Sequence, residues 1–359
     1  MGASLGVTWR GKAVVDLWGG WADLKRTKTW RKNTIVNVFS VSKIMLIMCV
    51  MVLVDRGKLD LDAPVCRYWP AFGLNGKDKV TVRDFLTHQG GVPFFDVPVT
   101  AHELGNWRRI TAQIAAQPHR FGGEKVLCYH PSTYGFVIGE IIRRVDGRYP
   151  QRFFRNEIAR KVGADFQIGL SSRWDVRRVA ELNIPAPLTA EQIQIEHPDL
   201  PITEIGLRVV EENNRLLSGD VMSWKRLSLL SPSANAYGNG RSIARLCAIL
   251  ANNGRLGWRR YISKKMAHEA SREQASGEDL YLGGIRWGLG FGLDSVHFPA
   301  PSHTAFHWGG FGGAWGVMDP GSRVSLGFAP NNLLLDPNMD PRLARLSAAL
   351  ASVIPTLAR

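Results

Sequence analysis

Two polar residues stand at the edge of the most apolar stretch of the chain. Ser40 and Lys43 lie three positions apart in VFSVSK (38–43), and the segment that follows, IMLIMCVMVLV (44–54), carries no charge. Residues three apart on a helix share a face, so the Lys43 amine can reach the Ser40 hydroxyl if a helix begins near Ser40. A serine hydroxyl becomes a nucleophile when a neighbouring base accepts its proton. The spacing therefore permits nucleophilic catalysis.

The environment expected for Lys43 would make its amine a base. Burial and the positive end of a helix both disfavour an ammonium group, so the pKa of Lys43 should fall below its ordinary value of about 10.4. The same helical turn presents the backbone N–H of Ser40, which could donate to a developing oxyanion. A simpler interpretation stays open from these residues alone, in which Ser40 caps the helix and Lys43 extends into solvent.

Two later segments favour the catalytic interpretation. CYHPSTYGFVIGEIIRRVDG (128–147) places Tyr129 in a loop just before a predicted helix. A tyrosine beside a serine and a lysine can take the proton of the nucleophile and pass it to the leaving group. FHWGGFGGAWGVMDP (306–320) is rich in glycine, which lets a backbone strand approach a ligand closely.

The elements that must position these residues follow from hydrophobic periodicity. Apolar spacing predicts helices at 41–56 (ended by Gly57), from Thr81, at about 132–145, at 242–254 and near the C-terminus. Alternation predicts a hairpin around Arg10-Gly11-Lys12 and several strands after about 280. The segment 170–235 is rich in proline and polar residues, which favours long loops and short helices.

Strands at both ends and helices in the middle predict an α+β fold. We expect one antiparallel sheet built from both termini and flanked by helices, with a mostly helical subdomain inserted. The chain would form a single catalytic domain, with 1–60 and 240–359 as the α/β part and 61–239 as the mostly helical part. A cleft between these parts is the expected place for a site.

Composition argues against several other classes of function. The net charge is +14, but the basic residues are scattered, so we expect no nucleic-acid partner. The four cysteines follow no metal spacing and no H-E-x-x-H motif occurs, so we predict neither a metal nor another cofactor. The segment 44–54 is too short to span a bilayer, and we see no signal peptide at the N-terminus. We therefore expect a cytoplasmic protein that does not associate with a membrane.

The order and spacing of three motifs resemble the serine β-lactamase-like superfamily, which shares the class C β-lactamase and penicillin-binding protein fold. The motifs are Ser40-Val41-Ser42-Lys43, Tyr129 and Trp308-Gly309-Gly310. Family VIII carboxylesterases are among the closest matches. Supporting segments run along most of the chain, including DRGKLDLDAPVCRYWPAF, TVRDFLTHQGGVP and PSANAYGNGRSIARL.

The resemblance implies a β-lactamase/transpeptidase-like fold and an acyl-enzyme mechanism. Ser40 would be the nucleophile, Lys43 its partner and Tyr129 the general base and acid. In the third motif, Trp308-Gly309-Gly310 replaces the Lys-Thr-Gly of lactamases, with the Phe311 N–H as second oxyanion donor. An alternative register, His307-Trp308-Gly309, would bring His307 into the site and make Gly310 the donor.

Departures from the lactamase pattern favour ester chemistry. Lactamases follow the tyrosine with x-Asn, whereas Tyr129 is followed by His130-Pro131. The amide and the cationic lysine that recognise a β-lactam are both absent from these motifs. We therefore predict a serine carboxylesterase acting on a small-molecule ester or acyl substrate. An acyltransferase of secondary metabolism is the alternative, a β-lactamase or DD-peptidase is less favoured, and a non-catalytic binding protein is the third class.

Overall fold

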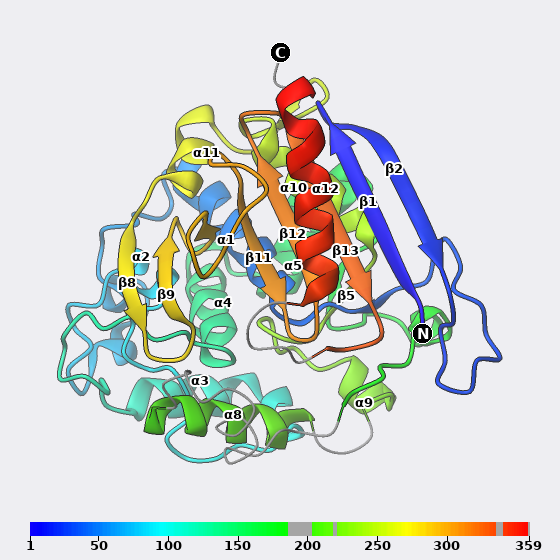
Figure 1. Cartoon of the computed structure of the whole chain (residues 1–359). Coiled ribbons are helices and arrows are strands. Elements are labelled where there is room, and N and C mark those ends of the chain that lie inside the picture. The colour runs from blue at the N-terminus through cyan, green and yellow to red at the C-terminus, as the bar shows by residue number, and fades with distance from the viewer. Residues whose placement is uncertain (186–202, 218–220, 335–339, 358–359) are drawn as a thin grey trace.

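Strands from both ends of the chain form one eight-stranded antiparallel sheet in the computed structural model (Figure 1). The structure describes residues 1–185, 203–217, 221–334 and 340–357. The strand order is β2-β1-β13-β12-β11-β10-β9-β8. The bounds are β1 (Ala3–Trp9), β2 (Lys12–Gly19), β8 (Ala275–Asp279), β9 (Gly283–Trp287), β10 (Gly292–Leu293), β11 (Phe306–Gly310), β12 (Ala314–Asp319) and β13 (Val324–Pro330).

Two smaller sheets complete the β structure. One joins β3 (Val36–Asn37), β5 (Ala236–Gly238) and β4 (Gln167–Ile168), and the other pairs β6 (Arg255–Leu256) with β7 (Arg259–Arg260). In the large sheet β1 lies antiparallel to β13, with Leu5 opposite Phe328. The first and last strands of the chain are therefore neighbours, and the predicted α+β fold with a sheet built from both termini is confirmed.

Helices cover both faces of the sheet and fill the region beside it. Their bounds are α1 (Ser42–Asp55), α2 (Val82–Leu86), α3 (Trp107–Ala116), α4 (Thr133–Asp146), α5 (Pro150–Phe154), α6 (Arg160–Val162), α8 (Glu204–Leu217), α9 (Trp224–Leu227), α10 (Gly240–Ala251), α11 (Lys264–Ser271) and α12 (Pro341–Leu357). Short 3₁₀ turns are η1 (Phe39–Val41), η2 (Val65–Arg67), η3 (Pro70–Gly73), η4 (Glu103–Gly105) and η6 (Arg173–Arg178), and η5 (Arg155–Ala159) is a π turn.

The two faces of the sheet pack against different helices. Successive residues of a strand point to opposite faces, so Trp315 and Val317 of β12 pack with Ile354 of α12. Gly316, between them, faces α1 and α10, where an added Cβ would lie 2.8 Å from Ile44. α12 thus covers one face while α1 and α10 cover the other (Figure 1).

Glycines let α10 lie unusually close to the sheet. A Cβ built on Gly327 of β13 would stand 2.3 Å from the carbonyl oxygen of Gly240, at the start of α10. A Cβ on Gly6 of β1 would stand 2.7 Å from Arg241 Cα. Larger residues at these positions would force helix and sheet apart.

The helix α1, which carries Lys43, lies in the centre of the molecule. Every residue of α1 from Ser42 to Leu53 is buried, and the helix contacts α4 and α5. This explains why 44–54 carries no charge, since a helix surrounded by protein has no face for a solvated side chain. α1 ends before Gly57, which has φ +66°, close to the predicted stop.

The structure differs from the expected elements in the region between the motifs. α8 is a helix of 14 residues, where loops and short helices were expected, so that part of the prediction is wrong. Its apolar residues Ile205, Val209 and Leu216 recur at helical spacing, and the polar composition of the segment concealed them. Part of the same region, 186–202 and 218–220, lies outside the described residues. α3 and β8 were not among the expected elements.

Candidate active site

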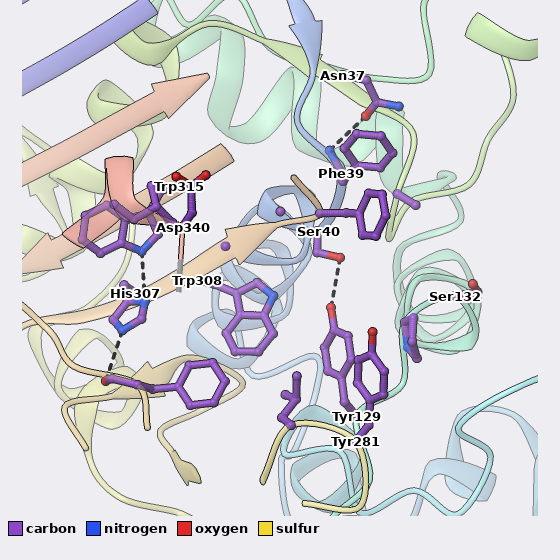
Figure 2. A pocket seen from close by; sticks show the side chains of 18 of the residues that line it. Asn37, Phe39, Ser40, Tyr129, Ser132, Tyr281, His307, Trp308, Trp315 and Asp340 are labelled. Carbon is purple, nitrogen blue, oxygen red and sulfur yellow. Dashed lines mark hydrogen bonds between the residues drawn. The ribbon is translucent and has the colours of Figure 1, made fainter. Parts of the chain in front are cut away.

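Ser40 sits in the 3₁₀ turn η1, immediately before α1. The preceding residue, Phe39, has φ +45°, a left-handed conformation that costs a non-glycine residue about 1 kcal/mol or more. The Asn37 side chain stabilises it, because Asn37 Oδ1 accepts a hydrogen bond from the Phe39 N–H at 2.9 Å (Figure 2). This turn directs the Ser40 hydroxyl into a cleft.

Two polar groups converge on the Ser40 hydroxyl. Lys43 Nζ lies 3.0 Å from Ser40 Oγ. The Tyr129 hydroxyl donates to Ser40 Oγ at 2.9 Å, as Figure 2 shows. Lys43 Nζ also donates to the Pro131 carbonyl at 2.8 Å. The structure therefore brings Tyr129 to Ser40 and Lys43, although Tyr129 lies far from both in the sequence.

Burial sets the protonation of this cluster. The Lys43 side chain is 1% exposed, and loss of solvation lowers the pKa of its amine well below the ordinary value. Burial raises the pKa of the Tyr129 phenol. At neutral pH the amine can therefore be neutral and the phenol protonated. In that state the Ser40 O–H can donate to Lys43 while Tyr129 donates to Ser40 Oγ.

Two buried histidines support the loop that carries Tyr129. His130 Nδ1 lies 2.6 Å from the Cys128 carbonyl, and its Nε2 accepts from the Val92 N–H at 3.2 Å. Burial lowers the pKa of His130 to about 3, so the ring is neutral. His88 Nδ1 accepts from the His130 N–H at 3.1 Å, and its ring packs 4.7 Å from that of Tyr129. Through these hydrogen bonds the two rings hold the loop that carries Tyr129.

The strand β11 presents Trp308 and His307 to opposite faces of the sheet. The ring of Trp308 lies 5.3 Å from that of Tyr129, on the same side as Ser40 (Figure 2). His307 Nδ1 instead accepts from Trp315 Nε1 at 3.0 Å, and burial lowers the pKa of His307 to about 4. Both residues line the cleft, but Trp308 is the one whose ring lies beside Tyr129, which favours the register Trp308-Gly309-Gly310.

The end of β11 comes against the turn that carries the serine. A Cβ on Gly310 would lie 2.1 Å from the Val38 carbonyl oxygen, so this close approach requires glycine. Beyond it, the ring of Phe311 packs edge-on against Phe39 at 5.6 Å. The end of β11 therefore lies in contact with η1, the turn that carries Ser40.

The cleft around Ser40 has a volume of about 740 Å³ and a mostly apolar lining. Its apolar side chains include Leu104, Leu216, Leu217, Leu229, Val296, Phe298, Pro299 and Leu343, from several separate segments. Polar and charged residues also line it, among them Arg226, Asn235, Glu278, His307 and Asp340. Tyr281, in the β8–β9 turn, also lines it and escaped sequence analysis. Its segment, GEDLYLGG, matches no motif, and only the topology brings it beside Tyr129.

Two further observations concern metal and membrane. Among the described residues, no group of three or more His, Cys, Asp or Glu side chains is arranged to hold a metal ion. No helix of the described ranges combines the length and the apolar character needed to cross a bilayer.

Comparison with known proteins covers almost the whole chain. The family model described as Beta-lactamase matches residues 1–350. The chain is 29% identical over 347 residues to "Esterase/beta-lactamase LipL" of Mycobacterium tuberculosis (strain ATCC 25618 / H37Rv), an alignment covering 93% of this chain and 77% of LipL.

Two solved structures are similar in both sequence and fold. A family VIII carboxylesterase is 34% identical, with a TM-score of 0.82 and coverage of 99% of this chain and 92% of that one. A penicillin-binding protein homologue from Caulobacter crescentus is 31% identical, with a TM-score of 0.84 and the same coverage.

Proposed function

The chain belongs to the beta-lactamase family, and from that premise we propose that it is a serine carboxylesterase that forms an acyl-enzyme on Ser40. The names of its relatives support an ester hydrolase, since one is an esterase/β-lactamase and another a family VIII carboxylesterase. The observation that carries the proposal is the contact of Ser40 Oγ with both Lys43 Nζ at 3.0 Å and Tyr129 Oη at 2.9 Å.

The resemblance implies Tyr129 as the base, but burial keeps its phenol protonated, so the proposed base in acylation is the neutral Lys43 amine. Lys43 takes the Ser40 proton as Oγ attacks the ester carbonyl. The ammonium ion that forms is stabilised by the Pro131 carbonyl oxygen, 2.8 Å away. The tetrahedral intermediate then expels the alkoxide, which takes a proton from the Tyr129 hydroxyl. Lys43 returns a proton to Tyr129, and the lysine–tyrosine pair is restored.

Deacylation runs through the same groups in reverse order. Water enters where the alcohol left and gives a proton to the Tyr129–Lys43 pair as it attacks the acyl carbonyl. The second tetrahedral intermediate expels Ser40 Oγ, which regains its proton from the same pair. The Ser40 and Phe311 N–H groups are the proposed donors to the oxyanion in both steps.

The cleft suits esters better than β-lactams. A β-lactam carries an amide and a carboxylate, whereas Trp308 contributes an aromatic ring where lactamases have a cationic lysine. Pro131 stands where they have an asparagine, and its carbonyl is already bonded to Lys43. The mostly apolar lining accommodates an uncharged acyl chain. We also propose that the chain acts as one catalytic domain, with 61–239 as its helical part, and that the enzyme is cytoplasmic.

Hydrolysis of p-nitrophenyl acetate, butyrate and octanoate by the purified protein tests this function. Ser40→Ala should reduce kcat by about 10⁴-fold or more, because the nucleophile itself is removed. Ser42→Ala is the matched control, since Ser42 is a buried serine two positions away. Absence of turnover across all three esters, or full activity in Ser40→Ala, would reject the proposal.

A further inference from the structure

A second phenol stands beside Tyr129 in the cleft. The rings of Tyr281 and Tyr129 are 6.1 Å apart and 11° from parallel. Figure 2 shows both hydroxyl groups pointing toward the Ser40 side of the cleft. Tyr129 Oη is bonded to Ser40, whereas Tyr281 Oη has no hydrogen-bond partner among the described residues. The Tyr281 hydroxyl is therefore left available to bind a group in the cleft beside Tyr129.

The turn that carries Tyr281 is held firmly. Asp279, which is 4% exposed, accepts hydrogen bonds through Oδ1 from the N–H groups of Tyr281 at 2.9 Å and Leu282 at 3.0 Å. The flanking strands β8 and β9 pair from Ala275 opposite Trp287 to Asp279 opposite Gly283. The Tyr281 ring is thus fixed against Tyr129 by a buried carboxylate and a sheet.

The proposed reaction places the alcohol portion of the ester beside these two phenols. Tyr129 gives its proton to the departing oxygen, so that oxygen must lie within hydrogen-bond distance of Tyr129 Oη. The carbons attached to it then extend over the parallel ring of Tyr281. Burial, followed by the nearby charge of Asp279, raises the pKa of Tyr281, so its hydroxyl is a donor at neutral pH.

We propose that Tyr281 forms a subsite for a second oxygen on the alcohol, so that esters of glycol- or glycerol-type alcohols are preferred to esters of simple alkanols. This inference rests on the proposed function. At this ring separation, one phenol can donate to each of two alcohol oxygens that are joined by two carbons, with hydrogen bonds of about 2.8 Å. A site built to bind a substrate hydroxyl discriminates against the analogue that lacks it, because its own polar group is then left unpaired.

Two butyrate esters of equal size test the subsite. 2-Hydroxyethyl butyrate and propyl butyrate differ only in a terminal hydroxyl against a methyl group, and hydrolysis is followed by base uptake at constant pH. The wild type should favour the hydroxyethyl ester in kcat/KM, after correction for the rates of hydroxide-catalysed hydrolysis. In Tyr281→Phe this preference should fall about tenfold, the effect of one neutral hydrogen bond.

A partition experiment tests the same subsite from the acyl-enzyme. With p-nitrophenyl butyrate as donor, equal concentrations of ethylene glycol and propanol compete with water for the acyl group. The wild type should yield more glycol ester than propyl ester, and Tyr281→Phe should lose that selectivity.

The outcomes separate this inference from the proposed function. A wild type that prefers the propyl ester, or a preference unchanged in Tyr281→Phe, would overturn the subsite while leaving the esterase intact. The first of these needs no variant and is independent of how Tyr281→Phe folds. Failure of the wild type to hydrolyse any of these esters would instead reject the proposed function, and the subsite with it.

Discussion

The two sides of the cleft differ in how many of their polar atoms are hydrogen-bonded within the protein. On the proton side, formed by Ser40, Lys43 and Tyr129, the polar atoms bond to one another and to backbone. On the aromatic side, formed by Trp308 and Tyr281, ring contacts dominate. Neither Trp308 Nε1 nor Tyr281 Oη has a hydrogen-bond partner among the described residues. The first side is where we propose proton transfer, and the second is where we propose contact with the substrate.

Removal of the base on the proton side should have the largest effect. Lys43→Met keeps a long apolar side chain in the buried position but cannot accept the Ser40 proton. We expect kcat for p-nitrophenyl butyrate to fall about 10³-fold with thermal stability preserved, because the buried amine itself costs solvation energy.

Lys77 provides the matched control for that substitution. It is equally buried, but its amine donates to backbone carbonyls, including Leu74 at 2.8 Å and Ala115 at 3.2 Å. Lys77→Met should lower the Tm and leave the kcat of the folded enzyme unchanged. A Lys43→Met enzyme that kept a tenth of its activity would contradict the assignment of Lys43.

Neighbouring substitutions on β11 should distinguish Trp308, whose ring lies beside Tyr129, from His307, whose ring is bonded to Trp315. Trp308→Ala should lower kcat/KM about 30-fold, because the ring beside Tyr129 is removed from the cleft. His307→Ala should lower stability by about 1–3 kcal/mol, since Trp315 Nε1 loses its buried acceptor. Its kcat/KM should change less than about threefold. The reverse order of kinetic effects would support the alternative register with His307 in the site.

The pH dependence of kcat/KM should report the proton side of the cleft. Protonated Lys43 cannot act as a base, so activity should rise with pH as the amine loses its proton. Because burial lowers the pKa of Lys43, this rise should occur below the ordinary lysine range. Burial raises the pKa of Tyr129, so loss of its proton should limit activity only above about pH 10. An acidic limb that persists in Lys43→Met would assign the titration to another group.

The smallest effect is expected at Glu212, outside both sides. Its carboxylate accepts from the Phe95 N–H at 2.9 Å, and burial raises the pKa of Glu212 to about 7. Between about pH 4.5 and 7 the folded state keeps a proton on Glu212 that the unfolded chain releases. The stability that protonated Glu212 contributes is therefore lost as pH rises from about 4.5 through 7. The Tm should fall by a few degrees between pH 5 and 8, and by less in Glu212→Gln. Equal slopes in the two proteins would refute this account of Glu212.

The sequence predicted the sheet and several of its flanking helices because their signals are local. The alternation in 3–9, the apolar run of α1 and the stop at Gly57 each lie within one segment. β8 could not be predicted, since ASGED has little intrinsic strand preference and is a strand because it pairs with β9. α3 did carry a helical signal, with Trp107, Ile110 and Ile114 on one face, and was overlooked.

The site shows the same division between local and tertiary information. Ser40, Lys43 and Tyr129 were singled out because their residue types and spacing carry chemistry by themselves. The face to which His307 or Trp308 points depends on the register of β11 against β12, with Gly309 opposite Trp315. Tyr281 becomes part of the cleft through the β8–β9 turn. The residues of the proposed proton chemistry could therefore be predicted from the sequence, whereas the proposed substrate contacts required the fold.

The central claim is that the acyl group is carried by Ser40, and rapid acid quenching during turnover of p-nitrophenyl butyrate tests it most directly. Intact mass followed by fragmentation of the tryptic peptide NTIVNVFSVSK (33–43) distinguishes Ser40 from Ser42. The account predicts a single butyryl group on Ser40, retained in Ser42→Ala and lost in Ser40→Ala. A butyryl group on Ser42, or one that persists in Ser40→Ala, would contradict it.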